Sequence, residues 1–484
     1  MSLAKNQGGP ATFVDRFIGI VDAGRCLCGP YLPLSIVRLG PDTLYPQPSN
    51  GYDSGKPIVR FSHNHVSGTG GGGRYGNIGL FPYAGKPTLD PGAGEADSET
   101  AAAGYYSVIF KGSGIRTELT STPRTGVHRY SFPAGQEANL LVDVGAVIQV
   151  GGEIPGENTG VSLGGFVERL SDSELCGRGD FKGGWGHSFP YSVYFYLKTD
   201  RPFLGCLLGN SEGPRPGVSA DGPNCRAALS FGLAGEVNVV VGISYASVAN
   251  ARRSVNRETR TADFRGRDFD ELRAEAVAVW DKSLSRIKVD GPDREQMVLF
   301  YTLFSRLICQ PSDLGIDDEF ASWKSGVRHF TDYYALWDSV RNANSLISLF
   351  DPELEVAMLN CLIDIAKHNE WLPDAWIAGH SAMIQGGSSA DVLICEAALK
   401  GLPGIDYAKA LEYMRRNNEV ESPDPWLYGR HLREYRDRGY LSTAIKKNCV
   451  SRTMEYAYQD WCIATLAGML GQAATAAEYR KSSE

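Results

Sequence analysis

The distribution of glycine divides this chain into two parts that favour different folds. Residues 1–250 hold 43 of the 56 glycines, and residues 251–484 hold the other 13. Glycine inside a helix or strand costs backbone entropy, so a glycine-rich stretch favours short elements joined by many turns. We therefore expect a first part made of short strands and a second part made of helices.

The first part carries short runs of β-branched and aromatic residues. Clear examples are residues 139–144 (NLLVDV), 191–197 (YSVYFYL) and 237–243 (VNVVVGI). Runs of this length, bounded by Gly, Pro and Asn, are typical of the strands of a large sandwich.

After about residue 265 the apolar residues recur at helical spacing. Leu272, Val277, Trp280 and Leu284 predict a connecting helix, and Pro292 is expected to open the next one. Further helices are predicted at residues 337–349, 353–369, 388–400, 406–417, 427–438 and 451–470. The predicted fold is α+β and multidomain: a sandwich over residues 1–262, a linker helix over 263–290 and a helical domain over 291–484.

Composition excludes several classes of function. The net charge is −8 and no basic block occurs, which argues against a nucleic-acid partner. No apolar run is long enough to predict a membrane span. The N-terminus (MSLAKNQGG) has no apolar core of a signal peptide, so the chain as written is expected to be cytoplasmic unless a leader is missing.

The ten cysteines are scattered. Cys26 and Cys28 form one close pair, but no second pair completes a zinc site. Cysteines in apolar helical stretches are interpreted as small core residues; these are Cys309, Cys361, Cys395 and Cys462.

Residues 68–73 (GTGGGG) match the glycine pattern of a dinucleotide-binding loop. That motif must open a helix, whereas residues 74–82 (RYGNIGLFP) predict a strand or turn, so the dinucleotide interpretation is excluded. Two interpretations stay open. The stretch is a flexible loop, or Gly68, Thr69 and Gly70 approach a ligand closely because the loop has almost no side chains.

His63 and His65 lie two residues apart, directly before that loop. On a strand, such a pair shares one face, so both imidazoles are expected to converge on one site. No third ligand is indicated, which disfavours a metal site. Buried structural histidines and contacts to sugar hydroxyls are the two other interpretations.

Trp337 and Asp338 are followed by Arg341 one helical turn later. An aromatic ring beside a carboxylate suits a sugar, because the ring stacks on the apolar face and the carboxylate accepts from hydroxyls. The alternative is a core tryptophan next to an Asp–Arg pair at helical spacing.

Two further segments have both a structural and a ligand-binding interpretation. In residues 383–391 (MIQGGSSAD), Ser388 or Ser389 is expected to cap a helix with Asp391 in its first turn, or the loop presents polar groups to a ligand. In residues 451–461 (SRTMEYAYQDW), Ser or Thr ahead of Glu455 predicts a capping box, and the aromatic residues are expected in the core.

No nucleophile motif appears in the chain. Glycoside hydrolysis uses two carboxyl groups, and Asp338, Asp391 and Asp460 are the candidates, although no spacing rule selects a pair among them.

Taken together, these segments resemble glycoside hydrolase family 92, the calcium-dependent exo-acting α-mannosidases. The matching stretches occur in family order: residues 14–19 (VDRFIG), 61–70 (FSHNHVSGTG), 126–133 (GVHRYSFP), 336–338 (LWD) with Arg341, and 451–458 (SRTMEYAY). The resemblance implies an N-terminal β-supersandwich, an (α/α)6 barrel and a site between them. It implies an inverting, calcium-assisted hydrolysis of an α-mannoside oligosaccharide or N-glycan, by a protein that is often secreted or periplasmic.

The resemblance also implies a set of substrate-binding residues. Asp338 matches the Asp of the family's Leu-Trp-Asp segment, which contacts a mannose hydroxyl, and Trp337 and Arg341 lie beside it. His65 and the loop of Gly68, Thr69 and Gly70 match the sandwich loop that faces the barrel. Residues 385–387 (QGG) differ from the form common in α-1,2-acting members, and Gln459 stands where an acidic residue is common, so the linkage is left open.

The segments that carry the family's general acid, general base and most calcium ligands do not occur in this chain. The resemblance therefore implies that they lie beyond Glu484 and that the barrel is truncated at the C-terminus. No catalytic residue and no metal ligand is assigned. The alternatives are a non-catalytic carbohydrate-binding relic or fragment, and an inverting glycosidase for another sugar. The expected assembly is a monomer or an oligomer of unknown size.

Overall fold

The computed structural model describes most of the chain as two compact units, Met1–Ser312 and Asp313–Glu484. We call them the sandwich unit and the helical unit. The described residues are 8–21, 24–66, 75–150, 160–184, 189–260, 268–289, 291, 293–316, 318–319, 322–333, 336–445 and 447–484.

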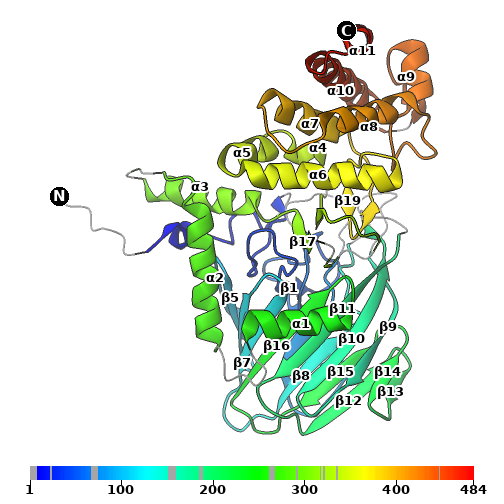
Figure 1. Ribbon diagram of the computed structural model, residues 1–484. Coiled ribbons are helices and arrows are strands. Elements are labelled where there is room, and N and C mark those ends of the chain that lie inside the picture. Colours follow the sequence, from blue (N-terminus) through cyan, green and yellow to red (C-terminus); the bar gives the residue numbers. More distant parts are fainter. Residues whose placement is uncertain are drawn as a thin grey trace, which may run out of the picture. The chain divides into compact units, whose positions relative to one another are not determined.

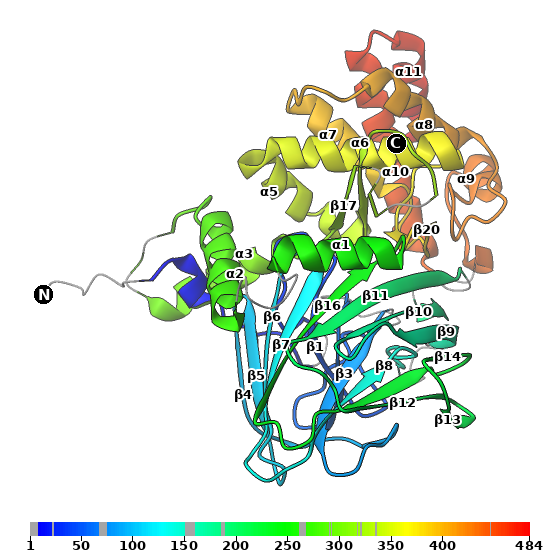
Figure 2. The ribbon, with the colours of Figure 1, turned by 60° about the horizontal axis from the view of Figure 1, so that its bottom comes forward.

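Within these residues the sandwich unit contains two antiparallel sheets (Figures 1 and 2). The seven-stranded sheet has the order β1 (Gly40–Thr43), β2 (Ile58–Ser62), β3 (Gly79–Ala84), β8 (Ala138–Asp143), β15 (Arg226–Ser230), β12 (Gly205–Asn210) and β13 (Gly213–Arg215). The nine-stranded sheet has the order β14 (Ser219–Asp221), β9 (Val161–Arg169), β10 (Glu174–Lys182), β11 (Tyr191–Thr199), β16 (Glu236–Ser244), β7 (Thr125–Ser131), β6 (Arg116–Ser121), β5 (Tyr105–Phe110) and β4 (Ala96–Ala102). The strands predicted from the three apolar runs are β8, β11 and β16, so the predicted sandwich is confirmed.

Strand β16 is buried on both faces, and this explains why its sequence does not alternate. Val239, Val240 and Val241 are all at most 2% exposed. Helix α1 (Val248–Thr259) lies across the nine-stranded sheet, and its Ala251 and Val255 pack in one cluster with Val240 (Figure 1). A strand covered by a sheet on one side and a helix on the other needs apolar residues at successive positions.

The other helices of the sandwich unit are η1 (Pro10–Phe13), α2 (Phe269–Leu284) and α3 (Arg294–Leu307). Helix α2 begins at a capping box formed by Asp268 and Glu271. Its fully buried Trp280 donates through Nε1 to the Tyr31 carbonyl at 2.8 Å. The predicted connecting helix is therefore present. Pro292 lies outside the described residues, and Asp293 caps α3.

The helical unit contains most of the predicted helices. They are α4 (Leu336–Ser339), α5 (Ala343–Phe350), α6 (Pro352–Asn369), α7 (Ser389–Leu399), α8 (Tyr407–Glu419), α9 (Leu432–Arg438), α10 (Cys449–Met469) and α11 (Ala473–Ser482), with the short 3-10 helix η4 (Thr443–Ile445). Two small hairpins accompany them, β17 (Ser312–Ile316) with β18 (Arg328–Thr331) and β19 (Trp376–Ile377) with β20 (His380–Ser381).

One predicted helix is wrong. The helix expected at residues 337–349 is broken into α4 and α5, because Asn342 has a φ of −162°, which is not helical.

The compact units divide after Ser312, so α2 and α3 belong to the sandwich unit. The predicted domain boundaries at residues 262 and 290 stay a prediction. The four cysteines expected in the core are buried. None of the described helices is long and apolar enough to cross a membrane.

Glu355 is a buried carboxyl group within the helical unit. It lies on α6, is 2% exposed and accepts from Asn344 Nδ2 at 3.2 and 3.1 Å. Burial raises its pKa from 4.5 to about 7, and the Asn344 hydrogen bond opposes this shift only in part. The folded state therefore holds the Glu355 proton more tightly than the unfolded chain does.

We predict that Glu355→Gln reduces the pH dependence of stability. Since the folded pKa is raised, the stabilisation by the Glu355 proton is complete below about pH 4.5 and is lost as the pH rises through about 7. The wild-type free energy of unfolding should fall by up to about 3 kcal/mol relative to the variant across this window. Urea unfolding at pH 5 and pH 8 measures this, with the exposed neighbour Glu353→Gln as control. Equal pH slopes for wild type and Glu355→Gln would contradict it.

Candidate functional site

Trp337 and Asp338 lie on α4, a helix of only four residues. Leu336 holds this helix in place. Its side chain is 1% exposed, and its amide donates to the Asp374 carbonyl at 2.9 Å. Because Leu336 points into the core, the next two residues point away from it, and Trp337 is partly buried whereas Asp338 is exposed.

The indole of Trp337 is held by Glu455 of α10. Trp337 Nε1 donates to Glu455 Oε1 at 3.0 Å, and Arg341 donates to the same oxygen. The Arg341 guanidinium also lies 5.0 Å from the centroid of the Trp337 ring. One carboxylate, 14% exposed, thus orients both an aromatic ring and a cation.

The Asp338 carboxylate is the site's open acceptor. Within the described part of the chain it has no hydrogen-bond donor as a partner. Desolvation raises its pKa, and the nearby Arg341 charge acts in the opposite direction. An exposed carboxylate beside a fixed indole is available to a hydroxyl-bearing ligand.

The loop before α7 packs directly against Trp337 and α10. A Cβ atom at Gly386 would lie 2.3 Å from Trp337 Cδ1, so only glycine permits this approach. A Cβ atom at Gly387, whose φ is +142°, would meet Gln459 and Tyr456 at 2.8 and 2.9 Å. The two glycines therefore bring the loop backbone between the indole and α10.

The first turn of α7 is capped by distant side chains. The Ser388 amide donates to Gln459 Oε1 at 3.0 Å, and the Ser389 amide donates to Asp374 Oδ1 at 3.0 Å. The prediction that Ser388 or Ser389 caps the helix is confirmed in position, because Ser388 is the N-cap residue and Asp391 lies in the first turn, but the Ser388 side chain makes no capping hydrogen bond. Burial raises the pKa of Asp374 to about 6, and hydrogen bonds from Ser389 oppose that shift.

Gln459 has a buried donor that the described residues leave unused. Its side chain is fully buried, and its Nε2 finds no acceptor among them. Such a donor lacks the hydrogen bond that a buried polar group normally has, so it is a candidate contact for a ligand or a bound water.

Asp391 and Asp460 are not available for chemistry. Both are fully buried and share the guanidinium of Arg430, with distances of 3.3 Å to Asp391 Oδ2 and 2.6 Å to Asp460 Oδ1. Asn418 also donates to Asp460 Oδ1 at 2.6 Å. The sequence-based candidacy of these two carboxyls is therefore wrong, since both are buried against Arg430.

The expected convergence of His63 and His65 is also wrong. Both residues follow β2, and their rings have different partners. His63 Nε2 lies 3.0 Å from His128 Nε2, whereas His65 Nε2 lies 2.8 Å from Asp42 Oδ1. The second ring nitrogen of His65 lies 2.6 Å from the Arg38 carbonyl. A sugar contact by His65 stays a prediction; its described contacts orient the end of β2.

Gly68, Thr69 and Gly70 lie outside the described residues, so their predicted ligand contact is untested. Residues 75–78, which directly precede β3, are described and contain no helix. This agrees with the exclusion of a dinucleotide-binding loop.

Sequence reasoning missed Glu455 and Asp374. Glu455 was expected in a capping box, but α10 begins at Cys449 and its N-cap residue, Asn448, makes no side-chain cap. The available signal was the spacing of four between Glu455 and Gln459, which places both on one face of a helix. For Asp374 the sequence carries no signal, because its partner Ser389 is brought to it only by the fold.

The described residues offer no ready metal site. No group of three or more His, Cys, Asp or Glu side chains among them is arranged to hold a metal ion. The donor set that calcium prefers, several carboxylate and carbonyl oxygens around one point, is thus not assembled from their acidic side chains.

Comparison with known proteins gives matches along the whole chain. A model of the glycosyl hydrolase family 92 N-terminal domain matches residues 13–244, and one of the glycosyl hydrolase family 92 catalytic domain matches residues 250–484. Because both domain models are matched, the expectation of a truncated barrel is not supported.

Related proteins are longer than this chain. An uncharacterized secreted glycosidase from Arthroderma benhamiae is 26% identical over an alignment of 508 residues. The alignment covers 97% of this chain and 61% of that protein. The family GH92 α-mannosidase BT3965 from Bacteroides thetaiotaomicron is 25% identical with a TM-score of 0.87, over 98% of this chain and 65% of that one. It has also been solved in complex with mannoimidazole. The inverting mannosidase BT2199 from the same organism, 22% identical with a TM-score of 0.85 over 99% and 65%, shows the fold alone. This chain therefore spans less than two thirds of the length of each.

We predict that Gly386→Ala displaces Trp337 and destabilises the helical unit. The new methyl group would lie 2.3 Å from Trp337 Cδ1, so the indole must move and weaken its bond to Glu455. Overpacking of this kind costs about 1–3 kcal/mol, which urea unfolding measures. Gly468→Ala on α10 is the matched control, because its nearest neighbour is 3.8 Å away. A Gly386→Ala protein as stable as wild type would contradict the described packing.

Proposed function

Because the chain belongs to glycosyl hydrolase family 92, we propose that it acts as an exo-acting α-mannosidase on α-mannoside oligosaccharides or N-glycans. The sugar in the proposal is supported by the likeness to the α-mannosidase BT3965, which binds mannoimidazole in its solved complex. The observation that carries the proposal is the arrangement of Trp337 and Asp338. The indole is held in place, and the neighbouring carboxylate is exposed and free to accept.

In this proposal Trp337, Asp338 and Arg341 shape the pocket for the terminal mannose. Asp338 accepts hydrogen bonds from sugar hydroxyls, which are stronger than neutral ones because the acceptor is charged. Glu455 acts through the other residues: it fixes the indole and holds Arg341 close to it. Gln459 Nε2 offers one further donor to the ligand.

We propose an inverting mechanism. One carboxylic acid protonates the glycosidic oxygen while a second carboxylate activates water on the opposite face, with room for that water between them. The carboxyls considered for this site do not provide this pair. Glu455 is engaged by two donors, and Asp391 and Asp460 are engaged by Arg430. The acid and base therefore stay unassigned in this chain.

Calcium assistance is a separate part of the proposal. The described side chains do not fit a calcium site, so no step is derived through the ion. The comparison of activity with calcium and with EDTA decides whether the ion is needed.

A non-catalytic sugar-binding protein is the second candidate. It is favoured by one specific observation: among the carboxyls discussed for this site, Asp338 is the exposed one. Such a protein would keep the mannose pocket and bind the sugar without hydrolysing it.

Release of mannose separates these functions. The purified chain should release mannose from α-1,2-, α-1,3- or α-1,6-mannobiose, and the same assays with calcium and with EDTA test the metal. Release would support the mannosidase. Binding of mannobiose without release would support the sugar-binding protein. Neither binding nor release of mannosides, but release from another aryl glycoside, would assign a different sugar.

We predict that Asp338→Asn lowers kcat/KM for the cleaved mannobiose about 10- to 100-fold. A hydrogen bond to a charged acceptor contributes about 1.5–3 kcal/mol, and the amide replaces it with a weaker one. Initial rates of mannose release measure this effect. Asp437→Asn on α9 is the matched control, an exposed aspartate expected to leave the rate unchanged. If both variants hydrolyse as fast as wild type, Asp338 does not contact the sugar.

A further inference from the structure

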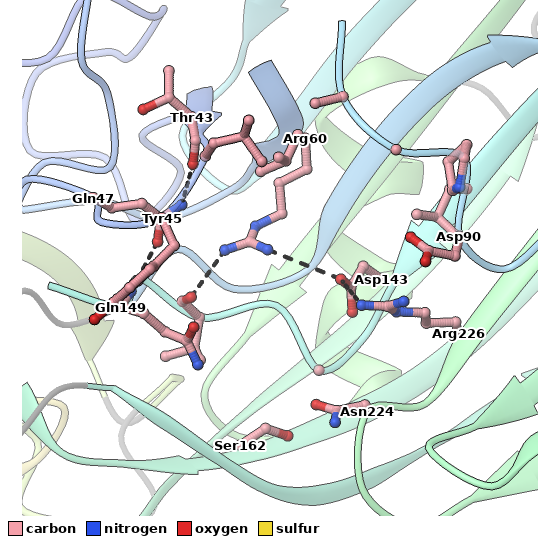
Figure 3. Close-up of a pocket in the computed structure, with 18 of the residues that line it drawn as sticks. Thr43, Tyr45, Gln47, Arg60, Asp90, Asp143, Gln149, Ser162, Asn224 and Arg226 are labelled. Carbon is pink, nitrogen blue, oxygen red and sulfur yellow. Dashed lines mark hydrogen bonds and ion pairs between the residues drawn. The ribbon is translucent and has the colours of Figure 1, made fainter. Parts of the chain in front are cut away.

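The sandwich unit contains a groove that the proposed mannose pocket does not use (Figure 3). Its volume is about 580 Å³, within the range of pockets that hold small organic ligands. Strands β1, β2, β8, β9 and β15 and the segments that follow β1, precede β4 and follow β8 contribute its lining. All of the lining residues lie in one compact unit.

A charged network forms the floor of the groove. Arg60 donates through Nε to the buried Asp42 at 2.8 Å and through Nη2 to the Val147 carbonyl at 2.9 Å. Asp143 lies between two arginines, 4.0 Å from Arg60 Nη1 and 3.3 Å from Arg226 Nη2. Because protein acceptors already bind these guanidinium groups, their positions do not depend on a ligand.

Several polar groups in the groove are not used by the protein itself. Among the described residues, Arg226 Nε and Ser162 Oγ are buried and have no hydrogen-bond partner. Asn224 reaches the lining because Gly145 lies against it; a Cβ at residue 145 would be 2.7 Å from Asn224 Cα. Buried polar atoms without partners indicate that a ligand or ordered water completes the site.

An exposed aromatic ring lies at one end of the groove. Tyr45 is 65% exposed, and Figure 3 shows it beside Gln47 and Gln149, while Asp90 lies at the other end with Arg226. Large aromatic side chains exposed next to a polar cleft offer a flat apolar face for a ligand.

The charges of the lining decide which class of ligand fits. The positive charges of Arg60 and Arg226 are balanced by the negative charges of Asp90 and Asp143. The lining therefore has no net charge that would attract a charged ligand. Arginine and carboxylate side chains side by side instead supply both donors and acceptors, as the vicinal hydroxyls of a sugar require. We propose that this groove binds a neutral oligosaccharide, with Tyr45 stacked on a sugar ring and Asp90 accepting from its hydroxyls. The identity of that sugar as an α-mannoside arm rests on the proposed function.

Photo-crosslinking tests the groove directly. The probe is a sulfur-linked α-mannotriose that carries a diazirine, since a glycosidase does not cleave it. Irradiation with the intact chain should label peptides that contain Tyr45 and Asp90, and excess unlabelled mannotriose should abolish the label. Tyr45→Ala and Asp90→Asn should each reduce labelling of these peptides at least fivefold. Tyr440→Ala, which removes another exposed tyrosine, should not.

The same preparations are assayed for mannose release, so the two proposals fail separately. Mannose release without labelling of the sandwich peptides overturns the groove and leaves the proposed function intact. Labelling that depends on Tyr45 and Asp90 supports the groove whether or not mannose is released. Labelling blocked by mannose 6-phosphate but not by neutral mannotriose overturns the neutral-sugar assignment, and so does equal labelling of wild type and both groove variants.

Discussion

The buried guanidinium of Arg430 is the interaction on which the helical unit depends. It is fully enclosed and pairs with Asp391 of α7 and Asp460 of α10, and Asp460 also accepts from Asn418 of α8. Removing one partner from such a group costs about 3–5 kcal/mol, because the remaining charge stays buried. Three helices are thus positioned around one cation, and the loop that leads into α7 is positioned with them.

The candidate site is a consequence of that packing. Helix α10 carries Asp460 toward the buried arginine and carries Glu455 and Gln459 toward the loop before α7. Glu455 then orients Trp337 and Arg341, and Gln459 caps the first turn of α7. Helix α10 therefore connects the stability of the helical unit with the geometry of the pocket. Its side chains fix the short, irregular segments on which the pocket lies.

The sandwich unit depends on a different set of contacts. Its strand β16 is apolar at successive positions because α1 covers one face, and Trp280 of α2 adds a buried bond to the Tyr31 carbonyl. The charged residues of the groove come from the middle of β2, the end of β8 and the start of β15. Arg60, Asp143 and Arg226 form the floor of the groove, where they pair with one another and with Asp42.

The sequence by itself determined the order of elements, because hydrophobic periodicity and glycine content act within a few residues of one another. The runs at 139–144, 191–197 and 237–243 became strands, and the helix expected at 353–369 became α6. Only the tertiary structure decided which polar residues meet. Trp337 and Glu455 are 118 residues apart, and no local pattern predicts that bond. For the same reason Asp391 and Asp460 looked available in sequence but are buried against Arg430, since burial and charge pairing depend on neighbours that folding alone supplies.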